Sequence, residues 1–384
     1  MKRFIAVVLV VTILTVLLAS CGNTIDEPVT TPSVGGETSS VPEKDEVPSF
    51  KAGLIVWGTS DSHGRYLSES FAWLEDLGGE VLFDTGALTP EGMITSAENL
   101  IQAGCDIIVF CTYVGESIVP TISNLCKDNG VYWAMWDTTV SDDIQTMINE
   151  NPYFCGTTNE NQVDAGYRAT KYMIEAGASD FILLKYGVGI PTCDLREEGA
   201  KAAIEEAGAH VTYTLMAPED TKKAVQDVLI SNPEANAFLS LGAAQTYCTP
   251  AIQAIASVGR KGEVQVGGFD FGDDMAKQIE DGDMSIVIGG HVTTAFFSAI
   301  MCLNEFWGNS LNPDNAELVI PYVDITSSED FDNFNTYIVG DELPYTHEEL
   351  QQFIVHYNPD LTWEKFQEQV ISFGVEDVIA RHGN

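Results

Sequence analysis

The stretch from Asn151 to Gly208 constrains the fold more than any other part of this 384-residue chain. A short extended segment, Tyr153–Gly156, precedes apolar residues that recur at helical spacing from Val163 to Ile174. The apolar segment Phe181–Lys185 has the length of a strand, and a second helix is expected from about Asp194. Strands and helices that alternate in this way build a parallel sheet covered by helices, so the stretch predicts an α/β fold.

The loop over Gly187–Arg196 is the place in this stretch where a ligand is expected. Ligands of parallel sheets collect beyond the carboxyl ends of the strands, and this loop follows such an end. Arg196 is the strong cation of the loop, and we expect it to face a ligand. The alternative is a surface ion pair between Arg196 and Glu197 or Glu198.

The same alternation of strands and helices runs from Gly53 to Asp137 and starts again at Tyr153. We therefore expect two doubly wound, Rossmann-like lobes, in agreement with the length of the chain. If the chain crosses between the lobes near 151–158, 286–291 and 324–328, a multi-stranded hinge joins them and lets them close. The expected boundaries are 51–154 with 288–323 for the N-terminal lobe, 155–287 for the C-terminal lobe, and 324–384 for a hinge return and a C-terminal helical cap.

Some local expectations are specific enough to compare with the structure. A loop over Gly58–Gly64 is expected to precede a helix over Ser68–Leu77, and Glu317–Val323 is expected as the last strand. The aromatic-rich C-terminal region is expected to contain two helices, His347–Val355 and Trp363–Ile371.

The composition excludes some partners. Against 57 acidic residues the chain has only 18 basic ones, a net charge of −39, so its surface repels nucleic acid and anionic membranes. Apart from Cys21, seven cysteines occur without metal-ligand spacing, and we expect them to be buried as small apolar side chains. The sequence gives no reason to expect a metal ion or another cofactor.

The N-terminal segment has the features of an export signal. A basic start at Lys2-Arg3 precedes an apolar run over Phe4–Leu18, which is shorter than the roughly 20 residues of a membrane-spanning anchor. The following Leu18–Cys21 segment resembles the lipobox of bacterial lipoproteins. That resemblance implies a signal peptide over 1–20, cleavage before Cys21 and a lipid on its sulfur. Residues 21–50 are expected to be the lipidated cysteine and a flexible linker.

The folded part resembles the type 1 periplasmic substrate-binding proteins, the ribose- and galactose-binding family that shares its lobes with LacI-type repressors. Five motifs in the right order carry this resemblance, and together they cover about residues 53–325. They are Gly104–Ile108, Asn129–Asp137, Cys155–Gly166, Arg196–Gly199 and Val264–Asp270.

The resemblance implies a ligand site between the lobes. It places Asp137, Arg196 and Asp270 at positions that bind the hydroxyl groups of sugars in the family. Carboxylates and a guanidinium together satisfy both the donors and the acceptors of a polyol. Aromatic side chains at strand ends are expected to stack on the apolar faces of such a ligand, and His291 replaces a glutamine of the family as a ligand contact or helix cap. These further candidates are Trp57, Tyr66, Tyr113, Trp136 and His291.

The implied function is capture of a small polar solute. A monosaccharide or related carbohydrate would be bound by lobe closure and delivered to the permease of an ABC transporter, and we expect a monomer anchored by its lipid to the outer face of the cell membrane. The alternatives are a sensing subunit for a membrane signalling partner, or a nucleoside-like or amino-acid-like ligand. An enzyme is not expected, because no GxSxG, HExxH or P-loop motif occurs.

Overall fold

The computed structural model describes residues 47–382 except 86, 188, 189 and 273. The expected signal peptide, the lipobox with Cys21 and most of the linker lie outside the described residues. Within the described part, no helix has both the length and the apolar character that a membrane crossing requires.

One sheet has six parallel strands in the order β11-β5-β4-β3-β1-β2. All four residues of β3 are buried, as expected for a central strand that helices cover on both faces. The carboxyl ends of these strands therefore meet at one edge of the sheet. The strands are β1 (Phe50–Val56), β2 (Gly79–Thr85), β3 (Ile107–Phe110), β4 (Tyr132–Trp136), β5 (Phe154–Glu160) and β11 (Glu317–Ile320).

The other sheet has the strand order β12-β10-β9-β8-β6-β7. Its strands are parallel except for β12, which pairs with β10 in the antiparallel sense. The predicted α/β class with two doubly wound lobes is confirmed. The strands are β6 (Asp180–Lys185), β7 (His210–Met216), β8 (Ala237–Ala243), β9 (Gln265–Phe269), β10 (Ile286–Gly289) and β12 (Val323–Ile325).

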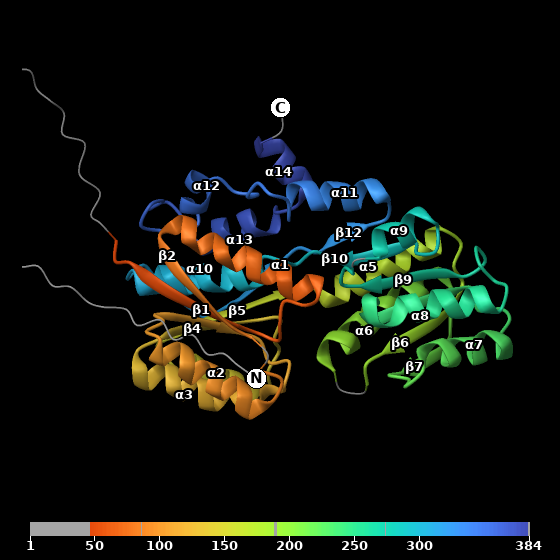
Figure 1. The fold of residues 1–384 in the computed structure, drawn as a ribbon, viewed down its shortest axis with the longest axis horizontal. Helices are drawn as coiled ribbons and strands as arrows, with labels where there is room; N and C mark the ends of the chain where they lie inside the picture. The colour runs from red at the N-terminus through yellow and green to blue at the C-terminus, as the bar shows by residue number, and fades with distance from the viewer. Residues whose placement is uncertain (1–46, 86, 188–189, 273, 383–384) are drawn as a thin grey trace, which may run out of the picture. The chain divides into compact units, whose positions relative to one another are not determined.

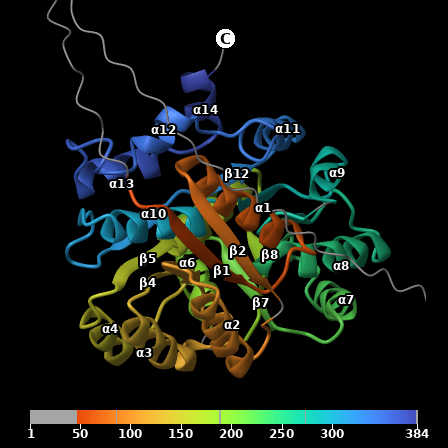
Figure 2. The same cartoon turned by 60° about the vertical axis from the view of Figure 1, so that its left-hand side comes forward.

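Helices cover both faces of the first sheet (Figures 1 and 2). Side chains of α2 and α3 pack with Ile108 and Phe110 on one face, whereas α1 and α10 pack with Ile107 and Val109 on the other. Successive residues of a strand thus point to opposite cores. The helices of this lobe are α1 (Ser62–Phe71), η1 (Ala72–Leu77), α2 (Pro90–Gln102), η2 (Glu116–Ile118), α3 (Val119–Asn129), α4 (Asp142–Asn149) and α10 (Thr294–Phe306).

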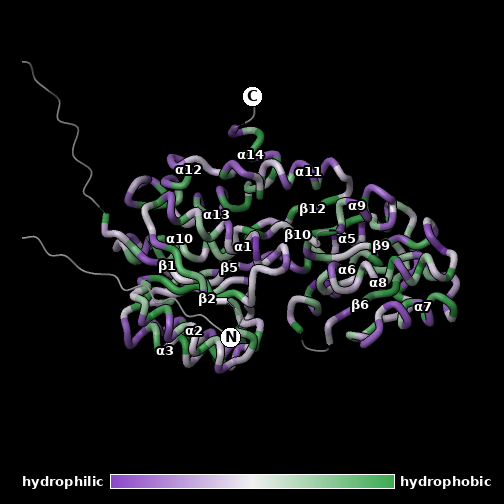
Figure 3. Tube along the Cα trace, viewed as in Figure 1, coloured by the Kyte–Doolittle hydropathy of each residue, from purple (hydrophilic) through white to green (hydrophobic). Residues whose placement is uncertain are grey.

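The second sheet is covered in the same way. Its core contains side chains of α5 and α6 on one face, and of α7 and α8 on the other. Figure 3 shows hydrophobic colour along the strands of both sheets and alternating colours along outer helices such as α3 and α7. The helices of this lobe are α5 (Gln162–Glu175), α6 (Pro191–Ala207), α7 (Thr221–Ser231), α8 (Ala244–Ser257) and α9 (Met275–Glu280).

Two glycines let the backbones of α5 and α6 touch. A Cβ atom on Gly166 would lie 2.0 Å from the carbonyl oxygen of Arg196, and one on Gly199 would lie 1.8 Å from the carbonyl oxygen of Val163. No other residue fits at such a close approach. Because Gly199 follows Arg196 by one helical turn, this contact brings the Arg196 side chain to the first residues of α5.

The chain passes between the two sheets at Asn161, between β10 and α10, and at Pro321-Tyr322. The expected single strand over Glu317–Val323 is wrong, because it is divided between β11 of one sheet and β12 of the other. Pro321 has no N–H group and cannot continue a strand ladder, so the ladder ends there. Similarly, β5 continues to Glu160 within the first sheet, past the lobe boundary expected at residue 154.

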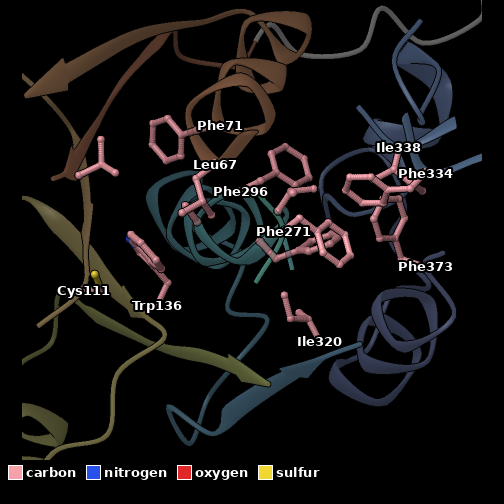
Figure 4. Packing of buried hydrophobic residues seen from close by; sticks show 14 of the residues in the cluster. Leu67, Phe71, Cys111, Trp136, Phe271, Phe296, Ile320, Phe334, Ile338 and Phe373 are labelled. Carbon is pink, nitrogen blue, oxygen red and sulfur yellow. The ribbon is translucent and has the colours of Figure 1, made fainter. Parts of the chain in front are cut away.

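The C-terminal region packs as helices on the first lobe and on α9. Its helices are α11 (Ser328–Tyr337), α12 (His347–Gln351), α13 (Trp363–Ile371) and α14 (Val375–His382). Both expected helices exist, but α12 ends before Val355, and α11 and α14 were not predicted. Figure 4 shows Phe334 and Phe373 of this region in the same apolar cluster as Leu67 and Phe296.

The seven cysteines of the described part are all buried, as predicted, and all are free thiols. Cys105, Cys111 and Cys126 lie in the apolar clusters of the first lobe.

Candidate functional site

A cleft of about 850 Å³ lies where the two lobes meet. From the first lobe, Trp57, Tyr113 and Asp137 line it, and from the second lobe Tyr186 and Ile190 do. These residues follow the carboxyl ends of β1, β3, β4 and β6. The cleft is therefore at the position where ligands of parallel α/β sheets bind.

Asp137 and Asp270 follow directly on the ends of β4 and β9. Both adopt left-handed backbone conformations, with φ of 43° and 67°. Such a conformation is rare for residues other than glycine, and aspartate and asparagine tolerate it best. Burial raises the pKa of the Asp137 carboxyl, although the positive charge of Arg196 opposes this shift.

Arg196 lies on α6 and is only 3% exposed. Its guanidinium donates hydrogen bonds to Gln162 Oε1 (2.8 Å), the carbonyl oxygen of Leu241 (3.1 Å) and the hydroxyl of Tyr322 (2.9 Å). It also stacks 4.2 Å from the ring centroid of Phe269.

Asp270 is the ion-pair partner of Arg196. The nearest oxygen of its carboxylate lies 3.9 Å from the guanidinium. Burial alone would lower the pKa of Arg196, but the neighbouring Tyr322 and Asp270 raise it, so the side chain stays charged. The alternative surface ion pair does not form, because Glu197 pairs with Lys185 and Lys201 instead.

Glu160 and Gln162 are site residues that the sequence did not suggest, and both line the cleft. The amide of Gln162 donates to Glu160 Oε2 (3.1 Å), while its oxygen accepts from Arg196 and from the Tyr322 hydroxyl (3.0 Å). Glu160 is only 4% exposed, and its Oε1 has no hydrogen-bond partner among the described residues. Burial, together with the negative charge of Asp137, holds the pKa of Glu160 well above its usual value.

His291 lies beside this network. It is buried, and its ring packs 4.3 Å from that of His63 and 4.9 Å from that of Tyr322, centroid to centroid. Burial, followed by the charges of His63 and Arg196, lowers the pKa of His291 well below its usual value. It is therefore neutral at pH 7, and it is not among the described residues that line the cleft.

The predicted aromatic side chains occupy different surroundings. Trp57 and Tyr113 line the cleft, with their ring centroids 5.6 Å apart. Trp136 does not, because it points from β4 into the core between the sheet and α10 and is fully buried (Figure 4). Strand alternation places it on the same face as Ala134. Tyr186, which sequence reasoning missed, supplies another ring and accepts a hydrogen bond from the Ala243 N–H (2.6 Å).

The structure places Tyr66 away from this cleft. Its ring packs against Phe334 of α11, with centroids 6.1 Å apart, and it lines a separate hollow beside the C-terminal region. The reason is that α1 begins at Ser62, before the expected helix start at Ser68. Asp61 caps α1 by accepting a hydrogen bond from the Gly64 N–H, so Tyr66 lies within a helix and not in a loop.

A family model described as a periplasmic binding protein domain matches residues 58–306, more than half of the chain. The chain belongs to the periplasmic binding protein family. The resemblance to type 1 members of this family, which the motifs predicted, is thereby confirmed. Periplasmic binding proteins bind solutes outside the cytoplasm and are not enzymes as a family.

Solved structures share the fold of this periplasmic binding protein. A periplasmic sugar-binding protein from Pseudomonas fluorescens aligns with a TM-score of 0.65 and 16% identity, over 86% of this chain and 99% of that one. An ABC transporter solute-binding protein from Actinobacillus succinogenes, with bound D-allose, has a TM-score of 0.64 and 16% identity, over 74% and 99%. The 5-methylthioribose transporter solute-binding protein from Thermotoga lettingae has a TM-score of 0.59 and 18% identity, over 85% and 97%. A comparison with curated protein sequences gave no match.

Proposed function

We propose that this periplasmic binding protein captures a small polar solute, a monosaccharide or related carbohydrate, in the interlobe cleft and delivers it to an ABC transporter permease. The observation that best supports this is the network around Arg196. One buried guanidinium binds Gln162, Tyr322 and Asp270, and Asp137 lies near enough for its pKa to respond to the same charge. Arg196 and the Tyr322 hydroxyl both donate to Gln162, which lines the cleft, and polar groups held in place in this way suit a ligand rich in hydroxyl groups.

The walls of the cleft also suit a carbohydrate. Trp57 and Tyr113 offer ring faces for the apolar C–H side of a sugar, while Asp137 and Gln162 offer polar atoms for its hydroxyl groups. Two of the solved structures with this fold are described with D-allose or 5-methylthioribose bound, which agrees with a ligand of this class.

Closure of the lobes is the proposed means of capture. The chain crosses between the sheets at three places, and segments such as Asn161 and Pro321-Tyr322 are short. Short connections between rigid lobes allow hinge closure with little strain. A fall in the radius of gyration on ligand addition, measured by small-angle X-ray scattering, is the expected result.

We further propose that Cys21 carries the lipid that holds the protein at the outer face of the cell membrane. The support is the Leu18–Cys21 sequence after a basic and apolar start. Cys21→Ser is expected to move the protein from the membrane fraction to the soluble fraction of the cells. Retention of this variant in membranes would contradict lipid anchoring.

Calorimetry with monosaccharides tests the proposed binding site. The wild-type protein is expected to bind at least one sugar, and Arg196→Lys is expected to lose most of the affinity, since an ammonium cannot reproduce the forked contacts by which the guanidinium holds Gln162 and Tyr322 in place. Lys201→Ala, at an exposed position on the same helix, is the control and should bind normally. Unchanged affinity in Arg196→Lys would exclude the Arg196 network as the ligand site.

A further inference from the structure

The cleft has an excess of negative charge that no lining cation balances. Four carboxylates line it, and no lysine, arginine or histidine is among its described lining residues. They are Glu116, Asp137, Glu160 and Glu317. The nearest strong cation, Arg196, has its hydrogen bonds directed at protein groups and its ion pair with Asp270. A ligand that enters this cleft thus meets acceptors and negative charge before it meets positive charge.

Asp137 and Glu160 are the two carboxylates of this set that lie deepest. Both line the cleft, and the negative charge of Asp137 is close enough to Glu160 to raise the pKa of its carboxyl. Glu160 Oε2 accepts from Gln162, but the buried Oε1 of this cleft-lining residue has no hydrogen-bond partner among the described residues. A buried polar atom without a partner costs about 1–3 kcal/mol, so an unpartnered oxygen at a ligand cleft indicates that a bound group supplies the missing donor.

A hydroxyl group and an ammonium group are the two kinds of ligand donor to compare for Glu160 Oε1. A hydroxyl group brings one proton for two facing carboxylates and adds a further acceptor, whereas a primary ammonium brings three donors and a positive charge. His63 is also near Asp137, but its ring stacks on that of Trp57 and packs in a tilted contact with that of His291. The ammonium of a ligand satisfies both carboxylates at once.

We propose that the ligand of this cleft is a small polyol that bears a primary amine, such as an amino sugar, and that its ammonium group binds between Asp137 and Glu160. This inference rests on the proposed function and narrows its ligand class. The polyol part would contact Gln162 and the aromatic walls formed by Trp57 and Tyr113, and the amine would approach the unpartnered Glu160 Oε1.

Matched sugars test this proposal in the purified protein. We would measure by calorimetry at neutral pH the binding of D-glucose, D-glucosamine and N-acetyl-D-glucosamine, and of the corresponding galactose and mannose compounds. In at least one series the amine is expected to bind about tenfold or more tightly than both the hydroxyl and the acetamide compound, as charge-assisted contacts in a buried site give. Equal or tighter binding of the neutral members in every series overturns the inference.

One variant and one control test whether Glu160 causes the preference for the amine. Glu160→Gln keeps the shape of the side chain but cannot ionise, so the ratio of the affinity for the amine to the affinity for the neutral sugar is expected to fall to about one. Glu280→Gln removes one exposed charge on α9 and is expected to keep the preference. A preference that persists in Glu160→Gln contradicts the proposed ammonium position.

The same experiment separates this inference from the proposed function. A wild-type protein that binds neutral sugars and excludes their amines retains the proposed function and overturns the inference. A protein that binds no member of any series overturns both.

Discussion

Asp137 and Asp270 occupy equivalent positions in the two lobes. Each directly follows a sheet strand, each has a left-handed backbone, and each donates its N–H to a carbonyl oxygen of the next strand, Thr158 or Ile288, at 2.8 Å. The two lobes thus present one carboxylate each from the same local geometry. The unusual φ values matter, because aspartate and asparagine accept them more readily than other side chains with a Cβ atom.

Two variants of Asp270 test its role in the fold separately from its role in ligand binding. Asp270→Asn is expected to keep the left-handed backbone, which asparagine also tolerates, but to lose about 1–3 kcal/mol of stability, because the buried guanidinium of Arg196 loses its ion-pair partner. Its ligand affinity is expected to fall about tenfold or more, because the ion pair with Arg196 is lost. Asp270→Val should in addition cost about 1–2 kcal/mol of stability through backbone strain. Urea unfolding and calorimetry measure the two effects, and similar stability of the two variants would contradict the role of the backbone.

The carboxyl of Glu160 predicts an unusual dependence of stability on pH. Its pKa in the folded protein is raised, first by burial and then by Asp137, with Arg196 opposing and Asp270 adding to the shift. A raised folded-state pKa means that the stability contribution is greatest below the unfolded pKa, about 4.3, and is lost as the pH rises through the folded value. The ligand-free protein is therefore expected to gain stability on going from pH 8 towards pH 5.

The measurement is thermal unfolding of Glu160→Gln and the wild type across this range. At pH 8 the variant is expected to be more stable by on the order of 1–3 kcal/mol, since a buried charge has been removed, and the difference should shrink as the pH falls. Glu280→Gln is the control: it shows how much the loss of one surface carboxylate changes stability at each pH. A constant difference between Glu160→Gln and the wild type would show that Glu160 does not change its protonation on unfolding.

The sequence predicted the lobes well because strand and helix periodicities are local. It missed Glu160 because the polar run around that residue has no strand pattern of its own. The residues Thr157–Glu160 become a strand by pairing with β4 on one side and with Glu317–Ile320, which lies far away in the chain, on the other. Tertiary pairing of this kind overrides local propensity, and no single-sequence pattern shows it.

The candidate site shows the same limit. Arg196 was found because it follows a strand and a glycine-rich loop, features that are visible in sequence. Its partner Tyr322 lies between β11 and β12, where one strand had been expected, so their contact could not be foreseen. Tyr66 was misplaced because Asp61 caps α1, which therefore begins more than one turn before the expected start at Ser68.

The contact between α5 and α6 gives a prediction about how Arg196 is positioned. Gly199→Ala would place a Cβ atom 1.8 Å from the carbonyl oxygen of Val163, so the helices must separate. We expect a loss of about 1–3 kcal/mol or more in stability and weaker ligand binding, because Arg196 then moves away from Gln162. Gly374→Ala adds the same methyl group where nothing lies within 4 Å and should leave both properties unchanged. Denaturant unfolding with calorimetry tests this, and normal binding by Gly199→Ala would show that the helix contact does not position Arg196.

Phe334 connects the C-terminal region to both lobes. It is fully buried, with its ring centroid 4.9 Å from that of Phe271, beyond β9, and 6.1 Å from that of Tyr66 on α1. Phe334→Ala removes these contacts and leaves a cavity, so a loss of about 3–5 kcal/mol in the free energy of unfolding is expected. Leu343→Ala, at a position that is 40% exposed, should change stability by less than about 1 kcal/mol. If urea unfolding gave similar small losses for both variants, the C-terminal helices would not be an integral part of the folded protein.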